Sequence, residues 1–323
     1  MEGVVDWVMR DTLSQIGGVD QFVTEFLRVT DKLHPEAVIY RNCPELKTQS
    51  RTRHGVPVFV QLLGGQAEPL AANAERAVKL GALGIDLNFG CPAKSVNRHD
   101  GGATLLKSSE RLYSIVKTVR TAISPEIPVT AKIRLGFDDP GACIENAQAI
   151  TEGGASCLTV HCRTKSDGYR PPAYWDWIPR IRESTAIPIV ANGEIWNPSD
   201  FDRCREVSGC NKFMIGRGAM SNPYIFKQIR EHINPGHSRL DLSNPPAQAS
   251  PDCKLWQQTK TLLPGFFEAS SLHINEYFAV SRTKQWLRAL SLKNPEAKEI
   301  FDRLKILRKP LEFRSELETF CTN

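Results

Sequence analysis

Short hydrophobic runs alternate with longer amphipathic segments between Phe22 and Pro251. Apolar runs bounded by turn residues predict buried strands, and apolar residues repeated at helical spacing predict helices. The predicted strands are residues 22–27, 58–63, 85–88, 128–136, 157–161, 188–193 and 212–218. The predicted helices within and before this region are residues 6–16, 71–80, 108–123 and 144–151.

Strands that alternate with helices indicate a parallel sheet covered by helices, in either a doubly wound sheet or a (β/α)8 barrel. No G-x-G-x-x-G follows the first predicted strand, so a dinucleotide-binding sheet lacks support. Polar side chains instead gather where several strands end, as the active site of a barrel requires. These residues are Gln61, Asn88, Lys132, His161, Asn192 and Arg217. The pattern therefore favours a (β/α)8 TIM barrel.

Seven predicted strands are one fewer than a closed barrel needs. The opening residues 1–4 look like the loop that follows a strand, so we expect the first strand upstream of Met1, with the start misassigned or the chain truncated. We expect a barrel domain over residues 1–235, a polar, proline-rich linker over 236–251 and a small helical domain over 252–323. The helical domain carries a small excess of positive charge, which suits a nucleic-acid surface but is also typical of a solvated face.

The composition is that of an ordinary globular protein, with 41% hydrophobic and 24% charged residues and a net charge of +5 among 323 residues. This mild positive charge permits a polyanionic partner. Nine cysteines without a C-x-x-C pair argue against structural zinc and against a disulfide framework. No apolar run approaches the roughly 20 residues that span a bilayer. We expect a cytoplasmic monomer without metal.

The stretch from Gly84 to Pro92 carries the most specific chemical signal. It reads as a short strand that runs into a tight turn and ends in a thiol, Cys91. Pro92 favours an extended conformation at Cys91, and Gly90 allows a ligand to approach the backbone closely. Residues 101–107 follow as a glycine-containing stretch that we expect to be flexible. Taken alone, Cys91 fits a buried hydrophobe as well as a reactive thiol.

Five strand-end motifs together resemble the tRNA-dihydrouridine synthases, over essentially the whole chain. They are Asn88-Phe89-Gly90-Cys91-Pro92, Lys132-Ile133-Arg134-Leu135-Gly136, His161-Cys162-Arg163-Thr164-Lys165, Asn192-Gly193-Glu194-Ile195 and Ile215-Gly216-Arg217-Gly218-Ala219. The segments 24–29, 168–170 and 282–287 look most like the bacterial branch that acts on uridine 16 of tRNA.

The resemblance implies an enzyme that reduces the C5–C6 double bond of a tRNA uridine. In that family FMN, recharged by NADPH, delivers hydride to C6, and a cysteine matched here by Cys91 protonates C5. A thiol with a pKa of about 8.5 is mostly protonated at neutral pH and can serve as this acid. The resemblance also implies the flavin-binding residues Met1, Glu2, Gln61, Lys132, His161, Asn192, Gly193, Glu194, Gly216 and Arg217.

The same resemblance implies contacts to the substrate. Asn88 is expected at the uracil edge, with Arg134 and Tyr169 around a base extruded from the folded tRNA. Arg28, Arg282 and Lys284 are expected to contact the RNA backbone. Two alternatives stay open: a flavin barrel acting on a free pyrimidine, and an RNA-binding protein without redox activity.

Overall fold

The computed structural model describes residues 2–234 and 251–322, so all of the expected linker 236–251 except Pro251 lies outside the described residues. The chain divides into two compact units. The first contains residues 1–3, 20–195 and 199–215, and the second contains residues 4–19, 196–198 and 216–323. Each unit therefore combines segments that are separated in the sequence.

A parallel sheet forms the centre of the first unit. Its strands are β1 (Phe22–Val23), β2 (Leu27–Arg28), β3 (Val58–Leu63), β4 (Ile85–Asn88), β5 (Val129–Arg134), β6 (Cys157–His161), β7 (Ile189–Asn192) and β8 (Phe213–Met214). They follow the order β1-β3-β4-β5-β6-β7-β8, and β2 also pairs with β3. The register places Asn88 beside Lys132, Arg134 beside His161, and His161 beside Asn192. The strand-end residues of the predicted site therefore occupy neighbouring positions.

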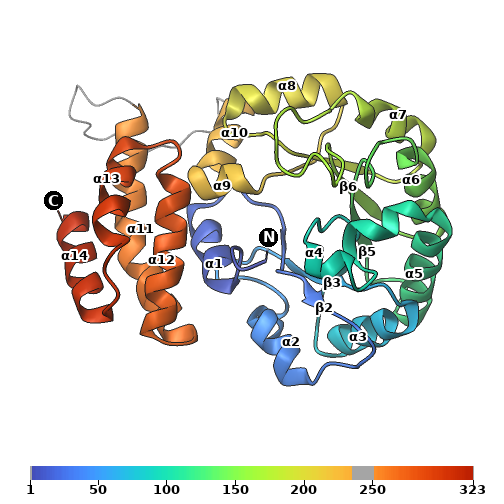
Figure 1. Ribbon diagram of the computed structural model, residues 1–323, viewed down its shortest axis with the longest axis horizontal. Coiled ribbons are helices and arrows are strands. Elements are labelled where there is room, and N and C mark those ends of the chain that lie inside the picture. Colours follow the sequence, from blue (N-terminus) through green and yellow to red (C-terminus); the bar gives the residue numbers. More distant parts are fainter. Residues whose placement is uncertain (1, 235–250, 323) are drawn as a thin grey trace. The chain divides into compact units, whose positions relative to one another are not determined.

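Helices cover the outer face of this sheet, as Figure 1 shows for α3, α5, α6, α7 and α8. The helices of the first unit are α2 (Glu36–Asn42), α3 (Ala67–Lys79), α4 (Lys94–Asn97), α5 (Ser109–Ala122), α6 (Cys143–Glu152), α7 (Trp177–Ser184) and α8 (Pro198–Ser208), with 3-10 helices at Pro44–Thr48 and Gly102–Lys107. Parallel strands linked by covering helices are the architecture of a (β/α)8 barrel, so the predicted fold class is confirmed. The fully buried strand residues Val58, Val60 and Ile85 explain why these runs are apolar.

The first and last strand predictions differ most from the structure, while the predicted strands 128–136 and 188–193 extend only slightly beyond β5 and β7. The first strand is interrupted between β1 and β2, because the Thr24 hydroxyl accepts the Gln61 N–H at 3.0 Å and takes the place of a ladder carbonyl. The last strand ends at Met214, because Gly216 starts helix α9 (Arg217–Ser221).

The second unit is helical. It contains α1 (Trp7–Ile16), α9, α10 (Ile225–Ile233), α11 (Pro251–His273), α12 (Glu276–Leu290), α13 (Pro295–Leu304) and α14 (Pro310–Thr322). Asp6 caps α1 by accepting the Met9 N–H at 3.0 Å, and Asn275 and Asn294 cap α12 and α13 in the same way. Helix α11 continues past Pro264, which lies inside it. Trp286, Leu287 and Leu290 are buried, so this part of α12 is core.

Candidate active site

Cys91 lies on the loop that follows β4. The loop begins with a turn in which the Asn88 side-chain oxygen accepts the Gly90 N–H at 3.0 Å. The half-buried Cys91 packs beside Phe26, Leu63 and Val96. Burial raises the pKa of the Cys91 thiol, and the negative charge of Glu2 adds to this effect. Cys91 is therefore a thiol at neutral pH and holds a proton that it can donate.

The segment after Cys91 folds back onto it. The Asn97 amide donates to the carbonyls of Cys91 at 3.0 Å and Ala93 at 2.7 Å, and the Ala103 N–H donates to Cys91 at 3.1 Å. Gly102 has a φ of +62°, and a Cβ there would lie 2.8 Å from the Cys91 oxygen. Residues 102–107 form a 3-10 helix with buried Leu105 and Leu106, and the expected flexibility of this stretch stays a prediction.

Arg134 joins the Cys91 loop to the loop after β6. Its side chain is almost fully buried. Its Nε donates to the Gly90 carbonyl at 2.9 Å, and its Nη1 donates to the carbonyls of Thr164 and Gly168 at 2.8 Å each. Burial lowers the pKa of Arg134. The Arg134 guanidinium thus positions two loops at the carboxyl ends of the strands, while its expected contact with substrate stays a prediction.

Lys132 presents a cation at the end of β5. Its Nζ donates to the Asn192 side-chain oxygen at 3.1 Å, and the Asn192 amide donates to the Met214 carbonyl at 2.7 Å. Burial, together with the smaller effect of the neighbouring Arg134 charge, lowers the pKa of Lys132 to about 8. A bound anion would offset the cost of keeping this ammonium charged.

His161 and Gly193 form the next part of the site, at the ends of β6 and β7. Gly193 has a φ of +123°, and a Cβ there would approach His161 Cδ2 to 3.2 Å. Arg163 braces this corner from inside: it is fully buried, pairs with Glu194 at 2.7 Å and donates to the Arg170 carbonyl at 2.6 Å. The motif that contains Arg163 did not predict this role, because Glu194 and the Arg170 carbonyl lie on loops whose approach to Arg163 no sequence pattern reveals.

Gln61 and Asn88 form a directional hydrogen-bond chain. The Gln61 amide donates to the buried Asp86 carboxylate at 2.7 Å, and the Asn88 amide donates to the Gln61 oxygen at 2.9 Å. Burial raises the pKa of Asp86, and hydrogen bonds from Thr130 and Gln61 oppose that rise. This chain fixes both amides beside Lys132, which pairs with Asn88 in the sheet register.

Two expected substrate residues lie in the same unit with part of their surface open. Tyr169 is 53% exposed, and its ring lies 6.1 Å from the His161 ring and 5.3 Å from the Arg134 guanidinium. Arg28, at the end of β2, donates to the Ser95 carbonyl at 3.2 Å. Tyr169 therefore presents an accessible aromatic surface at the strand ends.

The remaining candidates are Met1, Glu2, Gly216, Arg217, Arg282 and Lys284. Met1 lies outside the described residues, Glu2 belongs to the first unit, and the other four belong to the second unit. Arg282 is buried, and it pairs with Asp6 at 2.8 Å and donates to the Val4 carbonyl at 2.9 Å. Lys284 donates to the Leu307 carbonyl. Gly216 is the N-cap of α9, and Arg217 lies 5.2 Å from the ring of Trp196. In this structure Arg282 and Lys284 both hold helices of their own unit together.

The donor set in the first unit fits the expected flavin. Lys132 supplies a buried cation whose pKa is lowered by that burial, and Gln61, Asn88 and Asn192 supply amides. The missing side chain at Gly193 leaves backbone open beside His161. Among residues 2–234 and 251–322, no three His, Cys, Asp or Glu side chains gather as a metal ion would require. Within the same ranges, no helix is long and apolar enough to cross a bilayer.

Comparison with known proteins identifies relatives along the whole chain. A tRNA-dihydrouridine(16) synthase of Aquipseudomonas alcaligenes is 46% identical over 301 residues, which cover 93% of this chain and 91% of that protein. The enzyme of the same name from Neisseria meningitidis serogroup A is 42% identical over 320 residues, covering 99% of this chain and 92% of that protein.

Solved structures share the fold. Histamine dehydrogenase from Rhizobium sp. 4-9 matches with a TM-score of 0.53 and 16% identity, over 71% of this chain and 44% of that chain. A variant of NCR from Zymomonas mobilis matches with a TM-score of 0.51 and 15% identity, over 71% of this chain and 81% of that chain. The family model described as dihydrouridine synthase matches residues 1–314, and the chain belongs to the dihydrouridine synthase family.

Proposed function

We propose that this enzyme reduces uridine 16 of tRNA to 5,6-dihydrouridine and that Cys91 donates the proton to C5. Relatives named tRNA-dihydrouridine(16) synthase at 42–46% identity support the substrate and the position. The observation that carries the mechanism is the half-buried thiol of Cys91 at the end of β4, with a raised pKa. A group that must deliver a proton at neutral pH has to hold one, and burial ensures that Cys91 does.

The surroundings of Cys91 also stabilise the thiolate that forms when the proton is donated. The positive charge of Arg134 favours the thiolate, against the larger effect of burial. The Arg134 Nε–H holds the Gly90 carbonyl one residue before Cys91, so the thiol and this charge keep a fixed relation. Transfer of the proton to carbon leaves a thiolate that Arg134 stabilises, and the thiol is then restored from solvent.

The cofactor we propose is FMN, with NADPH as its reductant. Bound FMN would supply the hydride that reduces C6 of the uracil ring. Lys132 would stabilise negative charge on the ring, Gln61 would hydrogen-bond its pyrimidine edge, and His161, Asn192 and Gly193 would hold the adjoining groups. We further propose Met1, Glu2, Glu194, Gly216 and Arg217 as flavin ligands, as the family resemblance implies.

The substrate base has to leave the folded tRNA to reach a thiol at a strand end, so we propose that the base is extruded. Tyr169, which is 53% exposed, would stack on the extruded nucleotide, and Asn88 would contact the uracil edge. Arg28 is the proposed backbone contact in this unit. Direct contacts from Arg282 and Lys284 would require these side chains to leave Asp6 and Leu307. Action on tRNA implies a cytoplasmic enzyme.

Replacement of Cys91 tests the proposal. We expect Cys91→Ala to retain the flavin and to bind tRNA but to lose most turnover, since one general acid contributes about 10²–10⁴-fold. The substrate is tRNA that lacks the modification, and the dihydrouridine formed on it is measured by mass spectrometry. Cys157→Ala is the matched control. Cys157 also has a pKa raised by burial, but it begins β6, and the candidate site lies at the other end of that strand, at His161.

Normal turnover in Cys91→Ala would refute the proton-donor role. Equal activity on free uridine and on tRNA would instead indicate an enzyme of free pyrimidines. A colourless protein, without flavin absorbance near about 450 nm, that still binds tRNA would indicate a binding protein.

A further inference from the structure

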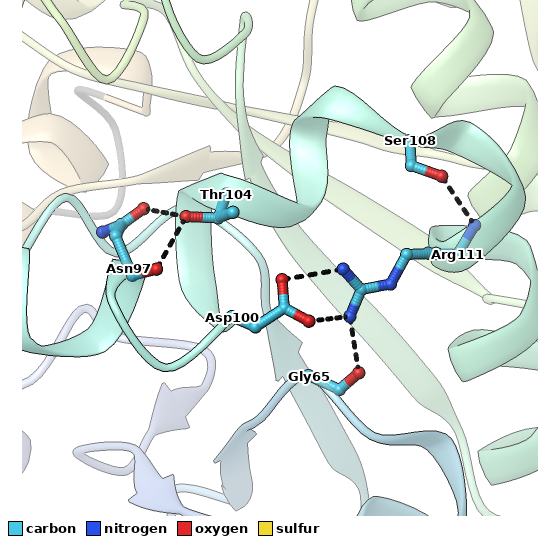
Figure 2. A network of polar contacts seen from close by, with 6 residues as sticks. All are labelled: Gly65, Asn97, Asp100, Thr104, Ser108 and Arg111. Carbon is cyan, nitrogen blue, oxygen red and sulfur yellow. Dashed lines mark hydrogen bonds and ion pairs between the residues drawn. The ribbon is translucent and has the colours of Figure 1, made fainter.

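An ion pair behind the Cys91 loop joins three segments of the first unit. Arg111, on α5, donates from Nη1 and Nη2 to the two carboxylate oxygens of Asp100 at 2.8 and 2.7 Å. The same Nη2 donates to the Gly65 carbonyl, on the loop after β3, at 2.9 Å. Figure 2 shows the Arg111 guanidinium facing Asp100 and Gly65. A planar guanidinium can make these bonds at once, and a lysine ammonium cannot match both carboxylate oxygens in the same way.

The backbone around Asp100 is shaped for this contact. Asp100 has a φ of +58°, a conformation that few residues other than glycine, asparagine and aspartate adopt readily. A Cβ on Gly65 would lie only 1.9 Å from the Asp100 carbonyl oxygen, so the two loops meet backbone to backbone. Arg111 holds the two loops at this contact.

The same segment reaches Cys91 by a short path. Gly102, two residues after Asp100, packs directly against the Cys91 backbone. The Thr104 hydroxyl donates to the Asn97 side-chain oxygen at 2.8 Å (Figure 2). The Asn97 amide in turn donates to the Cys91 carbonyl at 3.0 Å. A shift of Asp100 therefore moves the peptide that supports the thiol.

The loop has space on one side. A cavity of about 370 Å³ borders it, and Val96, Asp100 and Gly101 line this cavity together with Gly65 and Arg28. A loop released by Arg111 can move into this volume without displacing packed side chains. The cavity therefore leaves room for the loop to shift when the bonds to Asp100 are lost.

We propose that Arg111 and Asp100 form a latch that positions the Cys91 thiol for proton transfer, so that both are positioning residues of the reaction. The inference rests on the proposed role of Cys91. The Arg111 and Asp100 side chains are 39% and 60% exposed, and an exposed ion pair adds little to global stability. Its loss should therefore change the loop and the rate of turnover more than the melting temperature.

The test uses Arg111→Met and Asp100→Asn in the full-length, flavin-loaded protein. Asparagine keeps the shape of Asp100 and tolerates its positive φ, so Asp100→Asn removes the charge with little backbone strain. We expect kcat on tRNA to fall about tenfold with KM changed less than about twofold, since misplacement of a reacting group affects the chemical step. Arg111→Lys keeps the charge and should restore part of kcat.

A second measurement does not depend on tRNA reduction. The rate at which iodoacetamide alkylates Cys91, followed by peptide mass spectrometry over a pH series, should rise about fivefold in both variants as the loop opens. Salt should raise this rate in the unmodified protein, because it screens an exposed pair, and should have less effect in Asp100→Asn. The control is Glu75→Gln, which removes the exposed Glu75–Lys79 pair on α3.

Four results would overturn the latch: an unchanged alkylation rate, an unchanged kcat, a rise in KM that accounts for the whole loss, or equal effects in Glu75→Gln. If Cys91→Ala loses turnover while alkylation and kcat are unchanged in the Arg111 and Asp100 variants, the latch falls and the catalytic role of Cys91 stands. If Cys91→Ala retains turnover, the catalytic role of Cys91 falls, and a rise in alkylation then shows only that the ion pair holds the loop. The two proposals can therefore fail separately.

Discussion

Replacement of Arg134 by methionine should be among the most destabilising single changes at the site. Arg134 donates to three carbonyls, those of Gly90, Thr164 and Gly168, at 2.8–2.9 Å from a nearly fully buried position. Each buried acceptor left without a donor costs about 1–3 kcal/mol. Removal of the buried guanidinium charge recovers part of that cost, because burial lowers the pKa of Arg134. The expected net loss is about 2–4 kcal/mol of unfolding free energy.

The control is a second arginine on one of the same loops. Arg170 is exposed and donates to the carbonyls of Asp167 at 3.3 Å and Ser166 at 3.1 Å. We expect Arg170→Met to change stability by less than about 0.5 kcal/mol, as is usual for a surface position. Urea unfolding followed by circular dichroism at pH 7 gives both values. Equal slopes of unfolding free energy against urea concentration would confirm that the denatured state is unchanged. Equal losses of unfolding free energy in the two variants would refute the claim that Arg134 holds the two loops in place.

Two further predictions concern Lys132 and Gly102. Lys132 has a folded pKa of about 8 against an ordinary 10.5, so the unfolded chain binds a proton that the folded chain lacks between these values, and the Lys132 contribution to stability rises with pH there. The urea-derived stability of the flavin-free protein minus that of Lys132→Met should therefore grow by up to about 3 kcal/mol from pH 8 to 10.5; a constant difference would contradict the shift, and the variant should also retain less flavin. Gly102→Ala and Gly168→Ala share nearly the same φ, +62° and +61°, but only the Cβ at 102 has neighbours within 4 Å, among them the Cys91 oxygen and Cβ. Both should lose about 1 kcal/mol to backbone strain, with an additional loss of stability and turnover in Gly102→Ala alone; equal melting temperatures and equal kcat would contradict that contact.

The sequence predicted the strands that are buried on both faces and missed what long-range contacts decide. Residues 58–63, 85–88 and 157–161 are strands as expected, because apolar runs between turn residues have few other ways to be buried. The first strand could not be predicted as interrupted, since the cause is a bond between Thr24 and Gln61, 37 positions apart. The polar strand ends indicated a site, and the register places several of them side by side.

The roles of arginines were harder to predict. An arginine in a motif suggests phosphate binding, yet Arg134 and Arg163 are buried among loop carbonyls, and Arg282 pairs with Asp6. Arg134 donates to backbone carbonyls, which leave no trace in the identity of the residues that carry them, and the carboxylates of Glu194 and Asp6 are far from Arg163 and Arg282 in the sequence. Arg111 had no local signal at all, because its contact with Asp100 depends on a turn that follows Cys91.

The row of side chains from Asp86 through Gln61 to Asn88 can be satisfied in only one orientation. The Gly90 N–H at one end can only donate a hydrogen bond, so the Asn88 oxygen must face it, and the amides of Asn88 and Gln61 must both donate toward Asp86. A glutamate at position 61 would meet Asp86 with oxygen against oxygen. The turn before Cys91 therefore depends on the Asp86 carboxylate, although Asp86 itself is not part of that turn.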